Sequence, residues 1–148
     1  MALFECFHRS YSRSVIGWDL SSSLDRQSVI KALKKAILRR QPGKGLMIHS
    51  DRSVQYASED FKKVLNNHSF IQSMSRKGNC WDNAVAESFF SIIKSEMIHH
   101  EHFKGHNDTL PAVFEYIEVY YNRKRKHSTL GYRTPAQVDQ AIKSAVCF

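Results

Sequence analysis

The sequence has little cysteine, proline or glycine, and it has no long hydrophobic run. Its cysteines, Cys6, Cys80 and Cys147, are scattered and form no C-x-x-C pair, so a disulfide framework is excluded and free thiols are expected. Only 3 prolines and 6 glycines in 148 residues exclude collagen-like and low-complexity chains. No apolar stretch reaches the roughly 18 residues of a membrane-spanning helix. Glu5 and Arg9 stand where a secretion signal would be apolar, so we expect a cytoplasmic protein.

Acidic residues are scarce relative to basic ones. There are 22 Lys and Arg against 14 Asp and Glu, which gives a net charge of +8 with neutral histidine. The length and a hydrophobic content of 42% predict a single globular domain over residues 1–148. The excess positive charge favours a polyanionic partner, with nucleic acid ahead of an acidic membrane, because cations that neutralise phosphates release condensed counterions.

The hydrophobic pattern alternates between strand and helix periods. Strands are predicted at 2–7, 13–20, 46–48 and 70–74. Helices are predicted at 23–41, with a basic outer face, and at 58–67, 81–98, 110–121 and 135–146. In the first helix we place Leu24, Ile30, Leu33, Ile37 and Leu38 on the apolar face. This alternation of strands and helices predicts an α/β fold.

The most informative pair of residues is Asp51, just after a predicted strand, and Glu87, on the predicted helix 81–98. That helix has a buried line of Val85, Phe89, Ile92, Ile93 and Met97, and an opposite line of Ala84, Glu87, Ser91 and Lys94. Carboxylates at a strand end and on a neighbouring helix can converge on divalent cations, as two-metal phosphoryl transfer requires. The spacing alone favours the simpler alternative of solvated or capping carboxylates.

Three sequence blocks carry a more specific signal. They are HSDRSVQYASEDF at 49–61, QSMSRKGNCWDNAVAESFFSIIKSE at 72–96 and YNRKRKHSTLGYRTPAQ at 121–137. In order and spacing they closely resemble the transposases of bacterial insertion sequences whose catalytic core is like that of retroviral integrases. The resemblance runs from about residue 13 to about residue 140. It implies a ribonuclease-H-like mixed sheet flanked by helices, and a catalytic triad of two aspartates and one glutamate.

Within that resemblance, Asp51 corresponds to the second carboxylate and Glu87 to the third, and together they would bind Mg²⁺ or Mn²⁺. Counting back from Gly17 and Trp18, the chain begins inside the family's second strand. We therefore expect an N-terminally truncated transposase that lacks the central first strand and its aspartate. DNA strand cleavage and strand transfer would be impaired, and unpaired backbone groups would remain between the two neighbouring strands. The alternative function is a non-catalytic DNA-binding remnant or an inhibitor of full-length transposase.

Several further residues are predicted to contact DNA. Lys94 lies two helical turns after Glu87 and could reach a phosphate. In the loop before that helix, the residues that could guide the substrate strand are Arg76, Lys77 and Asn79. A basic C-terminal extension, helical from about residue 107, carries Arg123, Lys124, Arg125, Lys126, His127 and Arg133 after Tyr120 and Tyr121. Cations beside aromatics suit phosphate contacts and base stacking. A basic run is more often only a solvated surface, but this one contains no acidic residue, which favours DNA binding. The expected partners are the DNA ends of the element, target DNA, and a second copy or full-length transposase.

Overall fold

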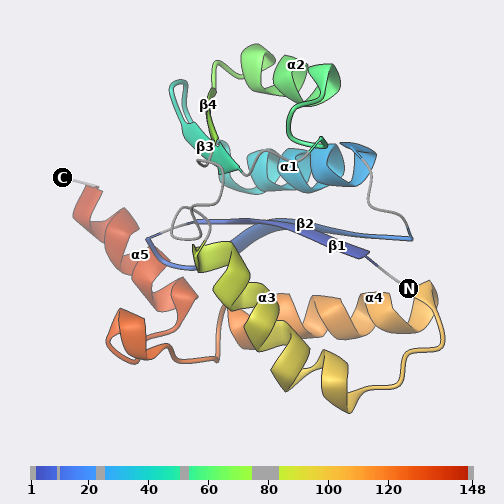
Figure 1. Cartoon of the computed structure of the whole chain (residues 1–148). Helices are drawn as coiled ribbons and strands as arrows, with labels where there is room; N and C mark the ends of the chain where they lie inside the picture. The colour runs from blue at the N-terminus through green and yellow to red at the C-terminus, as the bar shows by residue number, and fades with distance from the viewer. Residues whose placement is uncertain (1–2, 10, 23–25, 51–53, 75–83, 147–148) are drawn as a thin grey trace.

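The structure is a computed structural model that describes residues 3–9, 11–22, 26–50, 54–74 and 84–146 (Figure 1). The strands are β1 (Leu3–His8), β2 (Val15–Ser21), β3 (Met47–Ser50) and β4 (Ile71–Met74). The helices are α1 (Arg26–Arg40), α2 (Glu59–Asn67), α3 (Ala84–Glu96), α4 (His106–Phe114) and α5 (Pro135–Val146), with a π-helix η3 (Glu115–Tyr121) and 3-10 helices η2 (Ile98–His100) and η4 (Ser128–Leu130). The predicted α/β class is confirmed. None of the described helices has the length and apolar character needed to cross a bilayer.

The described strands form two small sheets. β1 and β2 pair antiparallel, with a register shift between Phe7 and His8, whereas β3 and β4 pair parallel, with Ser50 opposite Met74. Both strand directions of the predicted mixed sheet are therefore present. They occur in separate two-stranded sheets, and no strand within the described residues joins them.

Strand β1 packs on both of its faces. The ring of Phe7 lies 6.5 Å from Phe61 of α2 and 6.3 Å from Tyr56, on the side of α1 and α2. Its neighbour His8 points the other way, and its ring lies 4.8 Å from Phe89 of α3. This follows the two-residue period of a strand. Aromatic side chains thus connect the β1–β2 hairpin to the cluster that surrounds β3 and α2.

Helix α1 covers one face of the β1–β2 hairpin, and α3 and α4 cover the other (Figure 1). The buried residues of α1 are Ser28, Val29, Ile30, Ala32, Leu33 and Ala36. The prediction that Leu38 belongs to this face is wrong, because Leu38 is 77% exposed. At 3.6 residues per turn, Leu38 lies about 140° around the helix from Leu33.

The periodicity of α3 matches its prediction. Phe89, Ile93 and Met97 are buried in the core formed with β1, β2, α4 and η3. On the other side of the helix, the exposed line consists of Ala84, Glu87, Ser91 and Lys94. The fold therefore presents Glu87 and Lys94 to solvent along one helix face.

The helix predicted over 110–121 begins earlier, at His106, and ends as the π-helix η3. The i→i+5 bonding of a π-helix brings residues five apart to one side, and here Tyr116 and Tyr121 are both buried. The next residue, Asn122, takes the place of a strand partner at the start of β2. Its Oδ1 accepts the Val15 N–H at 2.9 Å, and its Nδ2 donates to the Val15 carbonyl at 2.9 Å.

Helix α5 is anchored by one backbone bond and by a buried aspartate. The N–H of Ala136 donates to the Asn122 carbonyl at 2.8 Å. Asp139 accepts from Arg40 of α1 at 2.7 Å and from Arg9 at 3.3 Å. Burial raises the pKa of Asp139. The hydrogen bond from Ser12 and the Arg40 guanidinium lower it by more, so the net pKa of Asp139 is below its ordinary value. These contacts fix α5 against α1 and against the segment between β1 and β2.

Candidate functional site

The two predicted catalytic segments leave the β3–β4 sheet at one edge. Because β3 and β4 are parallel and Ser50 pairs with Met74, both strands end side by side. The end of β3 is held by Gln72, whose Nε2 donates to Ser50 Oγ at 3.4 Å and to the Tyr56 carbonyl at 2.8 Å. Asp51 follows Ser50 directly in the sequence. The predicted residues that lie outside the described part of the chain are Asp51, Arg76, Lys77 and Asn79.

Glu87 is the predicted metal ligand that the structure does describe. It lies in the first turn of α3, where the helix dipole favours a negative charge, and its side chain is exposed. Lys94 is also exposed, in the last turn of the same helix. Within the described residues no group of three or more His, Cys, Asp or Glu side chains converges as a metal site would require. Glu87 is therefore an accessible carboxylate whose predicted partner ligand lies outside the described residues.

The C-terminal end of α3 is stabilised by a partly buried ion pair between Glu96 and Arg125. Arg125 Nη2 lies 2.7 Å from Glu96 Oε1, and Arg125 Nε donates to Oε1 at 2.8 Å. Tyr116 Oη of η3 donates to Glu96 Oε2 at 2.7 Å. Burial raises the pKa of Glu96, but the bonds from Arg125 and Tyr116 lower it more, so the net pKa is below its usual value. Sequence reasoning missed Glu96 because its partner Arg125 lies 29 residues further along the chain.

His127 is also part of the interior. It is only 4% exposed, and its ring packs edge-to-face on Tyr121 with centroids 5.1 Å apart. Burial, helped by the nearby charge of Arg125, lowers the pKa of His127 to about 4, so the ring is neutral at pH 7. Buried neutral imidazole offers no charge to a phosphate. Tyr121 is likewise unavailable for base stacking, since it is 2% exposed.

The structure therefore divides the predicted basic cluster into two sets. Arg125 and His127 point inward, where Arg125 pairs with Glu96 at the end of α3 and the His127 ring packs on Tyr121 of η3. The cations that remain exposed are Arg123, Lys124, Lys126 and Arg133. A run of basic letters could not have shown this division, because the side on which each residue lies depends on the loop's tertiary contacts.

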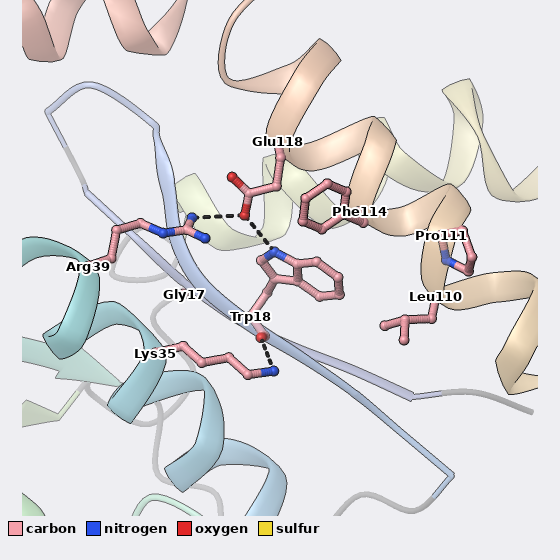
Figure 2. Close-up of a pocket in the computed structure, with 8 residues that line it drawn as sticks. All are labelled: Gly17, Trp18, Lys35, Arg39, Leu110, Pro111, Phe114 and Glu118. Atoms are coloured by element: carbon pink, nitrogen blue, oxygen red, sulfur yellow. Dashed lines mark hydrogen bonds and ion pairs between the residues drawn. The ribbon is translucent and has the colours of Figure 1, made fainter.

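A separate pocket of about 460 Å³ lies between α1, β2 and the α4–η3 helix (Figure 2). Its lining residues are Gly17, Trp18, Lys35, Arg39, Leu110, Pro111, Phe114 and Glu118. Its polar groups are already paired: Glu118 accepts from Trp18 Nε1 at 3.0 Å and from Arg39 at 2.8 Å. Within the described part of the chain, none of the predicted site residues lines it, so the pocket is distinct from the helix face that carries Glu87.

The chain matches the integrase core domain family in two overlapping stretches, residues 8–80 and residues 68–135. It belongs to this family of integrase-core proteins. Among them it is similar to insertion-sequence transposases, being 43% identical over 129 residues to transposase InsF of IS3A from Escherichia coli. That match covers 87% of this chain and 45% of InsF. The transposase of IS904 from Lactococcus lactis is 38% identical over 130 residues, covering 88% of this chain and 51% of the relative. The chain thus spans about half the length of these relatives.

Solved structures show the same fold. The catalytic core domain of BIV integrase superposes with a TM-score of 0.68 at 14% identity, covering 97% of this chain and 95% of that one. The catalytic core of HTLV-2 integrase, solved in a dimeric form in complex with magnesium, superposes with a TM-score of 0.62 at 17% identity. That match covers 92% of this chain and 83% of the integrase chain. The predicted ribonuclease-H-like fold of an integrase-type core is therefore confirmed.

Proposed function

We propose that this chain is the integrase-type catalytic core of an insertion-sequence transposase and acts in metal-dependent DNA strand cleavage and strand transfer, with activity impaired because only two of the family's three carboxylates are assigned. The observation that carries the proposal is the placement of Glu87, exposed on the polar line of α3, while β3 leads directly into Asp51. The 35 residues between the two carboxylates match the interval of the family that the chain resembles. Membership of the integrase core family supports the same reaction class.

Asp51 and Glu87 would hold Mg²⁺ or Mn²⁺. Their carboxylate oxygens are the hard ligands that these ions prefer, and the exposed position of Glu87 leaves its oxygens accessible. When bound, divalent ions supply activation of the attacking oxygen and stabilisation of the leaving oxygen in phosphoryl transfer. The magnesium found with the HTLV-2 integrase core supports this class of ion.

The exposed basic residues would hold the DNA of the element's ends and the target. They are Lys94 on α3 and Arg123, Lys124, Lys126 and Arg133 after η3. We extend the proposal to Arg76, Lys77 and Asn79, which precede α3 in the sequence. Arg125 and His127 would act indirectly, by fixing the loop that carries their neighbours. The dimeric and trimeric forms of the HTLV-2 core support assembly with a second copy or with full-length transposase.

A second candidate function is DNA binding without catalysis, which would make the chain a competitor of full-length transposase. It is favoured by the family resemblance itself, which assigns only two of the three carboxylates, Asp51 and Glu87, to residues of this sequence. The exposed cations serve this function equally well, so the two candidates differ only at the carboxylates.

Nicking of supercoiled plasmid in Mn²⁺ separates the two functions. We expect the unmodified chain to nick DNA slowly, because only two of the family's three carboxylates are assigned, and we expect Asp51→Asn and Glu87→Gln to reduce nicking to the background seen with EDTA. Glu59→Gln is the matched control, because Glu59 is also an exposed carboxylate in the first turn of a helix, and it should nick normally. Nicking that persists in both carboxylate variants would contradict the catalytic proposal. Equal DNA binding by all four proteins without any nicking would establish the second candidate.

A further inference from the structure

Tyr132 combines two features that are unusual for an aromatic residue. It is 71% exposed, and its backbone has φ of 60°, in the left-handed region that non-glycine residues rarely adopt. Gly131 before it has a similar φ of 65°. Bulky residues persist in this region only where the surrounding structure holds them there, and such positions cluster at functional sites. The fold therefore holds a large ring in solvent despite an unfavourable backbone conformation.

The turn that carries Tyr132 is fixed from the inside. Its N–H donates to the His127 carbonyl at 2.8 Å, and the His127 N–H donates to the Arg133 carbonyl at 3.1 Å. Beneath these bonds, the side chains of His127 and Thr134 are each 4% exposed. A tyrosine on such a turn has only two side-chain torsions to order on binding, so it loses little entropy. Tyr132 is thus a preorganised contact surface.

Two exposed cations lie close to Tyr132 along the backbone of this turn. Arg133 follows Tyr132 directly. Lys126 precedes His127, whose backbone forms an antiparallel β-bridge with Arg133. Arg133 Nε donates to the Leu130 carbonyl at 3.0 Å, so the guanidinium is oriented while the residue stays exposed. An aromatic face beside cations matches a nucleobase joined to its phosphates. An acidic protein surface would be recognised by the cations but would make no use of the ring's face.

We propose that Tyr132 stacks on an unpaired base of a DNA strand, while Lys126 and Arg133 contact the adjoining phosphates. This rests on the proposed function and deepens it, because it names single-stranded DNA as the ligand of this turn. Bases inside a duplex are stacked on both faces, so a projecting tyrosine gains a partner only where a base is unpaired. Tyr132 is then a DNA-binding residue of the loop after η3, separate from the carboxylates.

Binding of single-stranded and duplex oligonucleotides tests this assignment on the whole chain. Tyr132→Ala should weaken binding of a fluorescent single strand by about 5- to 160-fold, the range found when an aromatic is removed from under a base. Tyr132→Phe keeps the ring and should bind within about 2-fold of the unmodified chain. Tyr132→Leu keeps apolar area without a π-face and should behave like Tyr132→Ala. Binding of a blunt-ended, fully paired duplex should change less than 2-fold in all three.

Tyr11→Ala is the matched control, because Tyr11 is 72% exposed but lies in the turn between β1 and β2. It should leave single-strand binding unchanged. The assignment is overturned if Tyr132→Ala has no effect, if Tyr11→Ala weakens binding equally, or if duplex and single-strand binding fall together. Thermal unfolding of each variant shows that the fold is intact. If the unmodified chain bound neither form of DNA, the proposed function itself would fail, which is a distinguishable result.

Discussion

At the scale of single residues, desolvation keeps two histidines neutral at pH 7. Burial lowers the pKa of His8 to about 4, although a backbone hydrogen bond at Arg13 opposes this, and the ring packs on Phe89. Burial also lowers the pKa of His127 to about 4. In the unfolded chain both rings return to a pKa near 6.5. Each histidine therefore couples folding to pH.

Because both pKa values are lowered by folding, acid should destabilise the protein at pH values well above those at which carboxylates titrate. Between pH 6.5 and 4 the unfolded chain binds protons that the folded chain excludes, so the free energy of unfolding falls as the pH falls. The slope is up to about 1.4 kcal/mol per pH unit for each histidine. Above pH 6.5 this contribution is constant. Urea unfolding at a series of pH values measures it.

Variants separate the histidines from other groups. His127→Gln should remove about half of the change in the free energy of unfolding with pH. His99→Gln, at an exposed position in η2, should leave that pH dependence unchanged. Glu96 and Asp139 have lowered pKa values, so their stabilisation is lost only as the pH falls below their ordinary values of 4.5 and 3.8. A free energy of unfolding that stays flat from pH 7 to 5 would contradict the prediction.

At the scale of elements, the packing of α1 on β2 depends on Gly17. A Cβ at this position would lie 2.3 Å from the Ala32 carbonyl oxygen and 2.6 Å from Ala36 Cβ. Because the nearest atom belongs to the helix backbone, Gly17→Ala must push α1 away, and we expect a destabilisation of roughly 1–3 kcal/mol. Gly43→Ala is the control, since nothing lies within 4 Å of that position. Equal urea midpoints for the two variants would show that α1 adjusts without cost.

The local sequence pattern predicted the strands and α-helices well, but it did not predict the π-helix η3. The exposed line of α3, with Glu87 and Lys94, follows from the 3.6-residue period alone. The π-helix η3 does not, because it is stabilised by contacts distant in sequence. Asn122, for example, bonds to Val15 across 107 positions. Such a contact leaves no periodic signal in the sequence.

At the scale of the whole molecule, the sequence predicted the family and the exposed carboxylate but not which cations face solvent. The motif containing Arg125 reads as uniformly basic, yet this arginine is bound to Glu96. His127 in the same motif is buried. Tyr132 was missed because neither its exposure nor its left-handed backbone can be read from the residue type. The interior contacts of a loop thus decide which of its residues can bind.

The division of the basic cluster has a measurable consequence for DNA affinity. Lys124 and Lys126 are exposed, so each phosphate contact they make adds about 0.9 to the slope of log affinity against log salt. Replacing both by Gln should lower that slope by up to about 1.8, measured by fluorescence anisotropy with duplex DNA between roughly 50 and 200 mM salt.

The matched control replaces Lys31 and Lys34, two exposed lysines of α1, which lies across the β1–β2 hairpin from α3 and α4 (Figure 1). This variant changes the net charge of the chain by the same amount. If the loop after η3 holds the DNA, the Lys31 and Lys34 double variant should have the same slope of log affinity against log salt as the unmodified chain, within experimental error. An equal reduction in both double variants would show that the affinity reflects net charge alone, with no DNA site at the loop after η3.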